Sequence, residues 1–280
     1  MESVLLLGAT GNVGRNVAHR LTEAGERVRR ATRIPRAAID CRFDWHDDRS
    51  WAEALAGVDR VFVMTPETAG NLSGEATQLI ALADDVGVER IVLLSAIGVD
   101  DMVGDPTGMA QIEAAVIDAC ASHSIVRANT FMENFTTGPF ARSIITRDAV
   151  IAPVGNARVS FVCAADIARV VAHELSSSAR GGLLQVTGDE ALTFFDCART
   201  IGETTGRTID FIDPGVDGMR SILEDAATPP PVVDLILGFY ATLASGAHAL
   251  MTSTVADLTG HAPTSFAEFC STNDHVWSQR

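Results

Sequence analysis

The sequence predicts an α/β fold in which one parallel sheet is covered by helices on both faces. Three observations carry this prediction. The chain opens on an apolar run, a glycine turn and a helical pattern; continuous apolar runs then alternate with helical patterns; and 47% of the 280 residues are hydrophobic, enough for a full core. Such alternation is typical of parallel strands that are buried on both faces.

The opening turn is the first motif that carries chemistry. Gly8, Gly11 and Gly14 follow an apolar run at residues 4–7, and a helical pattern starts at once and ends near Gly25. Glycines let the backbone approach a ligand, and a helix N-terminus offers unpaired N–H groups and a positive dipole end. The turn therefore predicts a pyrophosphate site. Its spacing is one residue wider than the general dinucleotide motif, so a strand, turn and helix without ligand is the alternative.

A second strand is expected at residues 27–33, and Pro35 ends it. A site for NAD would place an acid at this strand end to hold the ribose hydroxyls. Arginines occupy these positions instead, and the first acid beyond them is Asp40. Arg33 suits a 2′-phosphate through charge-assisted hydrogen bonds. We therefore predict NADP(H) as the cofactor, with an edge strand carrying solvated arginines as the alternative.

Four more strands complete the predicted sheet. They end near Asp44 and cover residues 61–65, 91–95 and 124–128, with helical patterns between them. In such folds the ligand lies at the carboxyl ends of the strands. Asp44 either bonds an adenine amine or only starts a loop. The residues that we expect to contact the cofactor are Gly8, Thr10, Gly11, Asn12, Val13, Gly14, Arg33, Asp44, Thr65, Pro66 and Ser95.

The alternation of strands and helices weakens past about residue 138. A helix capped by Thr193 and ended by Gly206 is still expected, and residues after 215 have a mostly helical pattern. We predict a Rossmann-type NADP-binding domain at residues 1–150. Residues 151–280 are predicted to form a smaller, discontinuous, mostly helical C-terminal α/β lobe that caps the substrate.

Composition excludes several classes of function. The formal net charge of −15 argues against nucleic acid and disfavours anionic membranes. No apolar run is long enough to span a membrane, and no signal peptide is visible, so we expect a cytoplasmic protein. Five cysteines without a C-x-x-C pair, and scattered histidines, predict no metal site. The acidity would suit a cationic substrate, although many proteins are simply acidic.

Several short segments of the chain match segments of a known protein family and occur in the same order. Taken together they span nearly the whole chain and resemble the NmrA-like family of atypical short-chain dehydrogenases/reductases. The resemblance implies a Rossmann domain, NADP(H) and a small C-terminal lobe around the substrate; the family holds both reductases and non-catalytic NADP-binding regulators. The segments are Gly8–Gly14, Arg33 with Pro35, Ala56–Asp59, Thr65-Pro66, Ser95–Gly98, Arg127 with Phe131–Asn134, Ala165–Ala168 and Thr259–Phe266.

The chain departs from the wider superfamily at the proton donor. Typical members use Tyr-x-x-x-Lys, and the resemblance places Asp105 and Met109 at these two positions. The chain has no lysine, and its single tyrosine is Tyr240. A carboxyl group donates a proton near neutral pH only when burial raises its pKa, and Asp105 also fits a helix cap. Ser95, at the end of the fifth strand, either bonds substrate or caps the loop. The catalytic candidates are therefore Ser95 and Asp105.

We predict an NADPH-dependent reductase of a small molecule that is already electrophilic, such as an iminium ion, a quinone or a conjugated acceptor. These acceptors take up hydride without a protonated oxygen. A non-catalytic, redox-sensing NADP(H)-binding regulator is the alternative, and a dehydratase or isomerase is a weaker one. The residues expected to line the substrate pocket are Ile97, Met109, Phe131, Met132 and Asn134.

Overall fold

The computed structural model describes residues 3–66, 70–99, 107–119, 122–176, 179 and 181–278. The chain divides into two compact units and passes between them several times. The first unit comprises Met1–Ala128, Ala164–Val186 and Thr254–His261, and the second comprises Asn129–Cys163, Thr187–Ser253 and Ala262–Arg280. Residues 164–186 and 254–261, which the sequence prediction assigned to the C-terminal lobe, thus group with the first unit. The substrate-capping role of that lobe stays a prediction.

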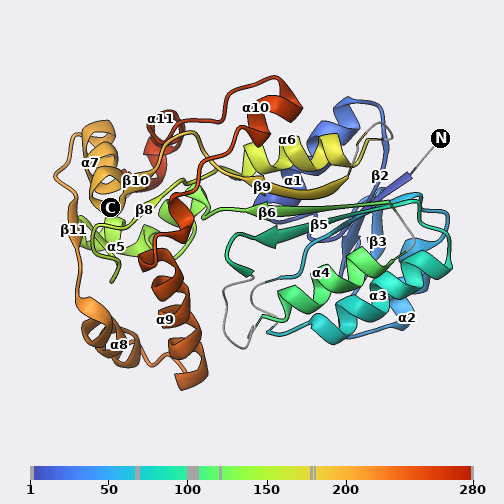
Figure 1. Cartoon of the computed structure of the whole chain (residues 1–280), viewed down its shortest axis with the longest axis horizontal. Helices are drawn as coiled ribbons and strands as arrows, with labels where there is room; N and C mark the ends of the chain where they lie inside the picture. The colour runs from blue at the N-terminus through green and yellow to red at the C-terminus, as the bar shows by residue number, and fades with distance from the viewer. Residues whose placement is uncertain are drawn as a thin grey trace. The chain divides into compact units, whose positions relative to one another are not determined.

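The first unit is built on one sheet of seven strands, all parallel, in the order β3-β2-β1-β4-β5-β6-β9 (Figure 1). The carboxyl ends of β1, β2 and β4 are therefore neighbours. This arrangement confirms the predicted Rossmann-type sheet. The strands are β1 (Ser3–Leu6), β2 (Arg27–Thr32), β3 (Asp40–Arg42), β4 (Arg60–Val63), β5 (Arg90–Ala96), β6 (Ser122–Ala128) and β9 (Gly182–Val186).

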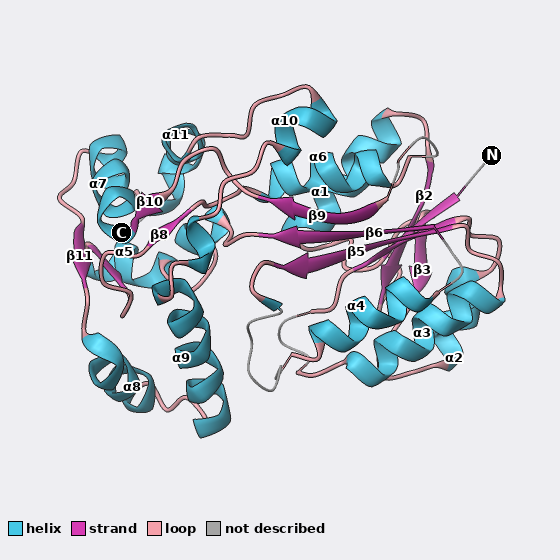
Figure 2. Ribbon diagram, viewed as in Figure 1, coloured by secondary structure: helices cyan, strands magenta, loops and turns pink. Residues whose placement is uncertain are grey.

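Helices cover both faces of this sheet. Two of them, α1 (Asn12–Glu23) and α6 (Ala164–Glu174), pack against each other on one face together with α10 (Thr254–Thr259). The other face carries α2 (Arg49–Leu55), α3 (Ser73–Asp85) and α4 (Met109–Asp118), as Figure 2 shows. Because helices cover both faces, the central strands β1 and β4 are buried over their whole length, whereas β2 carries three arginines and begins with an exposed one.

The core of the first unit follows from the two-residue period of its strands. Leu5, Val61, Ile91 and Ile125 lie in one hydrophobic cluster with the apolar sides of α2, α3 and α4. Each side chain is at most 2% exposed, and full burial of a side chain of this size stabilises the fold by about 1.5–3 kcal/mol. The sheet is thus a rigid frame that holds the loops at its carboxyl edge.

The second unit is mainly helical. Its core is an aromatic cluster in which Phe135 lies 5.0–6.1 Å, centroid to centroid, from Phe140, Phe161, Phe194 and Phe266. The predicted cap at Thr193 is confirmed as a capping box with Asp196. Its elements are η3 (Met132–Phe135), α5 (Ala141–Arg147), β7 (Ala149–Ile151), β8 (Arg158–Val159), β10 (Leu192–Thr193), α7 (Phe194–Thr205), β11 (Asp210–Ile212), α8 (Gly215–Asp225), α9 (Pro230–Ala244), η4 (Ala247–Ala249) and α11 (Phe266–Trp277).

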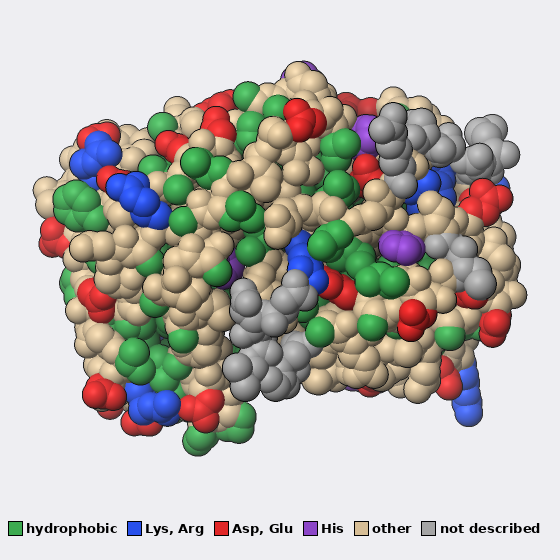
Figure 3. Space-filling view, in the orientation of Figure 1, with side chains coloured by type: hydrophobic (Ala, Val, Ile, Leu, Met, Phe, Trp, Pro, Cys, Tyr) green, Lys and Arg blue, Asp and Glu red, His purple; other side chains and the backbone are tan. Residues whose placement is uncertain are grey.

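The chain has an excess of acidic residues, with 36 Asp and Glu against 21 Lys and Arg. On the face shown in Figure 3, red side chains are scattered and do not gather into one patch. Within the described ranges, no helix has both the length and the apolarity needed to cross a bilayer. Among the same residues, His, Cys, Asp and Glu side chains form no group of three that could hold a metal ion.

Candidate functional site

The glycine turn joins the carboxyl end of β1 to the start of α1. Its own backbone closes it, because the N–H of Gly11 donates to the carbonyl oxygen of Gly8 at 3.0 Å. Gly8 has a φ of +66°, which L side chains rarely adopt. A hydrogen bond of the backbone and a left-handed glycine therefore define the shape of the turn.

The three glycines of this turn are needed for different reasons. A Cβ on Gly8 would lie 2.1 Å from Cε of Met64, and a Cβ on Gly14 would lie 2.2 Å from the carbonyl oxygen of Gly8. A Cβ on Gly11 would meet those same two groups at 3.4 Å, an ordinary contact distance, and its φ of −78° suits any residue. Glycine is needed at position 8 for its positive φ and at position 14 because a side chain would overlap the backbone of the turn, whereas neither reason applies to Gly11.

The N-terminus of α1 is electrostatically prepared for an anion. The helix begins after Gly11 without a side-chain cap and without an acidic residue in its first turn. The first N–H groups of a helix have no intrahelical acceptor and carry the positive end of the dipole. Thr10 is exposed and Asn12 is half-buried, whereas the side chain of Val13 is buried in the core, so only its backbone faces the turn. The residues present fit a pyrophosphate at this end of the helix.

We expect Gly11→Ala to weaken NADPH binding by about tenfold or more, equivalent to about 1.4 kcal/mol, and to leave the unfolding temperature unchanged. The new methyl group meets no protein atom closer than 3.4 Å, but it fills the space through which the backbone approaches a pyrophosphate. Fluorescence titration with NADPH and thermal unfolding measure the two effects.

Gly14→Ala is the matched variant. Its methyl group would overlap the backbone of the turn, so we expect a lower unfolding temperature. Unchanged NADPH affinity in a folded Gly11→Ala protein would show that this glycine has no part in binding.

The end of β2 presents an arginine and no available acid. Arg33 is the first residue after β2; it is exposed, and its side chain has no partner among the described residues. Asp40, the nearest acid beyond, is bound to Arg30 at 2.7 Å and has a side chain only 6% exposed. Hydrogen bonds from the backbone, first that of Arg36, hold the pKa of the Asp40 carboxyl below its usual value. Asp40 is thus ionised and already occupied, and it is not free to bind ribose hydroxyls.

The remaining residues predicted to contact the cofactor follow β3 and β4. One carboxylate oxygen of Asp44 accepts the N–H of His46 at 3.0 Å, and its carbonyl accepts Nε1 of Trp51 at 2.8 Å. These bonds shape the turn before α2 and favour the loop-starting role for Asp44. Thr65 is half-buried and Pro66 is exposed; both follow β4, the strand beside β1.

Ser95 belongs to a buried polar network at the ends of β5 and β6. Its hydroxyl donates to Oε1 of Glu113 on α4. Arg127, its neighbour in register on β6, donates to the same carboxylate through Nε at 2.9 Å and Nη2 at 2.6 Å. All three residues are buried, with at most 8% of their surface exposed. The proton of Ser95 therefore points to a carboxylate and not toward a ligand.

The described residues of the first unit include neither a tyrosine nor a lysine. Met109 begins α4 and packs against the core of this unit, and Ile97 is buried with its N–H bound to the carbonyl of Ala128 at 3.0 Å. Asp105 lies outside the described residues. Tyr240 belongs to the second unit, where burial raises the pKa of its phenol to about 12.

Three residues predicted to line the substrate pocket lie in η3 or just before it, within the second unit. Met132 is buried in the core, whereas Phe131 and Asn134 are half-buried. Phe131 forms a single parallel bridge with Val162, and the carbonyl of Asn134 accepts the N–H of Phe140 at 3.0 Å. Their contact with substrate stays a prediction.

A second buried network was not predicted. Asn129 follows β6 and donates through Nδ2 to Oγ of Ser160 at 2.7 Å and to the carbonyl of His248 at 2.9 Å. Its Oδ1 lies 2.8 Å from Nδ1 of His248. The two residues are 119 positions apart, so no local pattern indicates the pair.

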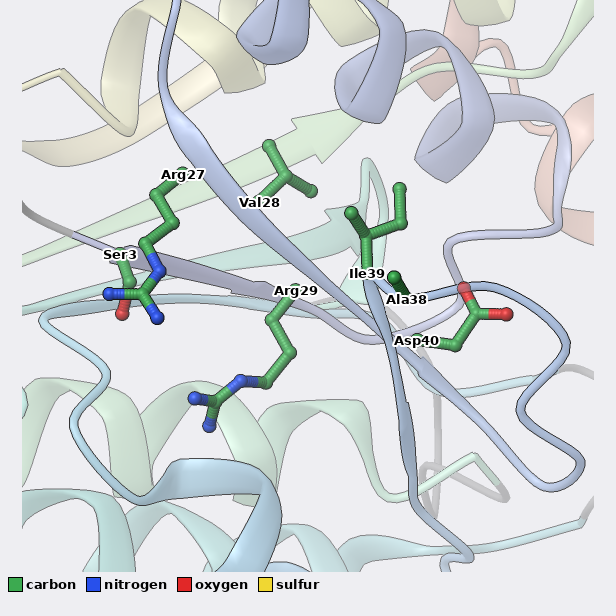
Figure 4. A pocket seen from close by; sticks show the side chains of 7 residues that line it. All are labelled: Ser3, Arg27, Val28, Arg29, Ala38, Ile39 and Asp40. Carbon is green, nitrogen blue, oxygen red and sulfur yellow. The ribbon is translucent and has the colours of Figure 1, made fainter.

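A pocket in the first unit lies on the amino-terminal half of β2. It adjoins the first residue of β1, whereas the glycine turn follows the last one, so it is not the expected cofactor site. Its lining residues, shown in Figure 4, are Ser3, Arg27, Val28, Arg29, Ala38, Ile39 and Asp40.

Comparison with known proteins agrees with this geometry. Residues 8–177 match the model of the NAD(P)H-binding family. The (4-alkanoyl-5-oxo-2,5-dihydrofuran-3-yl)methyl phosphate reductase of Streptomyces griseus is 32% identical over 95% of this chain and 96% of its own. Agroclavine dehydrogenase of Claviceps fusiformis is 28% identical over 99% of each chain. The NADPH-dependent quinone oxidoreductase QOR2 of Escherichia coli, solved with NADPH, shares the fold with a TM-score of 0.86 and 20% identity over 96% of this chain and 99% of its own.

Proposed function

The chain belongs to the NAD(P)H-binding family, as its NmrA-like resemblance predicted, and we propose that it is an NADPH-dependent oxidoreductase that reduces an already electrophilic small molecule. The glycine turn and the N-terminus of α1 would hold the pyrophosphate, and Arg33 would hold the 2′-phosphate. Bound NADPH supplies the hydride. The protein contributes position, charge and exclusion of water.

The proposed substrate class rests on which residues could donate a proton to the substrate. The Ser95 hydroxyl donates its hydrogen bond to Glu113, the family resemblance places Met109 at the position of the superfamily's lysine, and the only tyrosine is Tyr240. Reduction of a ketone to an alcohol needs a proton on the oxygen, which a positioned acid normally provides. An iminium carbon accepts hydride without that proton. Quinones and conjugated acceptors spread the added charge, so they too depend less on a positioned acid.

The names of the relatives support a redox role. One relative is named a reductase of a 5-oxo-2,5-dihydrofuran, another a dehydrogenase of agroclavine, and a solved neighbour is a quinone oxidoreductase. A dihydrofuran ring that carries an oxo group, and a quinone, are both conjugated electrophiles. These names favour acceptors that are reactive before they meet the enzyme.

The test is NADPH oxidation by the purified protein with a panel of imines, quinones, enones and ketones, and NADPH affinity measured alongside. Turnover of at least one pre-activated class supports the proposal. Tight NADPH binding without turnover of any acceptor would favour a regulator that senses the cofactor. Absence of both binding and turnover would contradict both functions.

We expect Arg33→Ala to reduce NADPH affinity by about 10- to 150-fold, because a hydrogen bond to a charged group is worth about 1.5–3 kcal/mol. NADH, which lacks the 2′-phosphate, should bind the variant and the wild-type protein equally. Titration of both cofactors measures the ratio. Arg199→Ala is the control, because it removes an arginine that is 53% exposed on α7 in the second unit. A wild-type protein that binds NADH as tightly as NADPH would contradict the assignment.

A further inference from the structure

The segment between β2 and β3 is exposed, yet one buried carboxylate holds it. Residues 33–39 connect the two strands without a helix, and all seven are exposed. Asp40, the first residue of β3, has a side chain only 6% exposed. The backbone of this segment therefore depends on what Asp40 binds.

Both oxygens of the Asp40 carboxylate are occupied. Oδ1 accepts Nε of Arg30 at 2.8 Å and Nη2 of Arg30 at 2.7 Å. Oδ2 accepts the backbone N–H of Arg36 at 2.8 Å and of Ala37 at 2.9 Å. Figure 4 shows this carboxylate turned away from Arg27 and Arg29. Asp40 thus neutralises Arg30 on β2 and pins the backbone at Arg36.

Two cations are left for a ligand. The side chains of Arg33 and Arg36 are exposed and have no partner among the described residues. They flank Pro35, whose ring restricts the backbone between them. A segment that is held in place before binding loses less conformational entropy when a ligand orders its side chains.

We propose that Asp40 is a positioning residue for cofactor selection, and that it holds Arg36 as a second ligand to the 2′-phosphate beside Arg33. This rests on the proposed use of NADPH. Asp40 itself touches no phosphate; it acts through the backbone of residues 36 and 37. The sequence alone indicated Asp40 only as the first acid beyond the arginines of β2.

The direction in which Asp40→Asn changes NADPH affinity distinguishes a positioning role from a simple electrostatic effect. If the charge of Asp40 mattered only by its field, Asp40→Asn would remove a repulsive charge, release Arg30 and tighten NADPH binding. A positioning role predicts the opposite, namely NADPH affinity weakened by about tenfold, the scale of one charge-assisted hydrogen bond, and NADH affinity unchanged. A merely structural role would weaken both cofactors equally.

Arg36→Ala is the second variant, and it leaves the Asp40 hydrogen bonds intact because Arg36 contributes only its backbone N–H to them. We expect it to fold normally and to weaken NADPH by about tenfold. Asp47→Asn is the matched control. It breaks another Asp–Arg pair at the same sheet edge, that of Asp47 with Arg42 at 2.7 Å, without touching residues 33–39.

The experiment titrates NADPH and NADH into the full-length wild type and variants, with competition by 2′-AMP and 5′-AMP as activity-independent probes. Asp40→Asn and Arg36→Ala should weaken 2′-AMP but not 5′-AMP, and Asp47→Asn should change neither. Equal losses for both nucleotides, unchanged values, or tighter NADPH binding by Asp40→Asn would overturn the inference. If Arg33→Ala abolishes the preference for NADPH over NADH while Asp40→Asn and Arg36→Ala retain it, only the inference about Asp40 and Arg36 is wrong. If the wild-type protein has no preference for NADPH, the proposed cofactor is wrong.

Discussion

A quinone or an iminium ion should be reduced with a kcat/KM about 10²–10⁴-fold higher than a ketone of similar size and shape, because that range is what a positioned acid typically contributes. The described part of the first unit contains neither a tyrosine nor a lysine. Ser95 donates its hydrogen bond to Glu113, and the family resemblance predicts Met109 at the lysine position. Steady-state rates with NADPH held saturating measure the ratio.

Efficient ketone reduction would contradict this prediction and reveal a donor. Asp105, which lies outside the described residues, and Ser95 would then be replaced first, as Asp105→Asn and Ser95→Ala. If Asp105 is the donor, the Asp105→Asn variant should lose ketone activity and keep quinone activity. Loss of both activities together would indicate damage to cofactor binding and not to proton transfer.

Glu113→Ala should destabilise the protein by about 3–5 kcal/mol, because it leaves the buried guanidinium of Arg127 without its carboxylate. Both side chains are at most one-tenth exposed, and Nη2 of Arg127 lies 2.6 Å from Oε2 of Glu113. Chemical denaturation measures the free energy of unfolding, and the paired variant Glu113→Leu with Arg127→Met should recover most of the loss.

The control for this prediction is Glu203→Ala. Glu203 pairs with Arg199 at 2.8 Å, but the two side chains are 62% and 53% exposed, so about 0.2–1 kcal/mol is expected. Equal losses in Glu113→Ala and Glu203→Ala would mean that water reaches the Arg127 site and that the network is not a structural anchor.

Local patterns carried the prediction of the first unit. The strands β1, β4 and β5 are short apolar runs, and the turn after β1 contains Gly8, Gly11 and Gly14. In the second unit, the cap at Thr193 depends only on residues within three positions of it. These signals are interactions between near neighbours in the chain, so a single sequence displays them. The separate roles of the three glycines were not visible, because Met64 and the carbonyl of Gly8 meet them only after folding.

The networks could not be predicted for the same physical reason. Glu113 and Arg127 are 14 residues apart, and Asn129 and His248 are 119 apart. Which polar residues are paired in the interior depends on the register of the strands and the docking of helices, and neither leaves a periodic trace. Asp40 is an intermediate case. The sequence shows that it is the first acid after β2, but its hydrogen bonds with the backbone of Arg36 and Ala37 are visible only in the folded structure.

The return of residues 164–186 to the first sheet has a consequence for biosynthesis. When only the first 150 residues have emerged from the ribosome, six of the seven strands of this sheet are available. The edge of β6 that pairs with β9 is then still unpaired. The apolar side of α1 that α6 covers is also bare at that moment. Unpaired strand edges and uncovered apolar faces are sites of aggregation. A gene truncated near codon 150 should therefore yield insoluble product, whereas the nascent full-length chain depends on rapid arrival of β9.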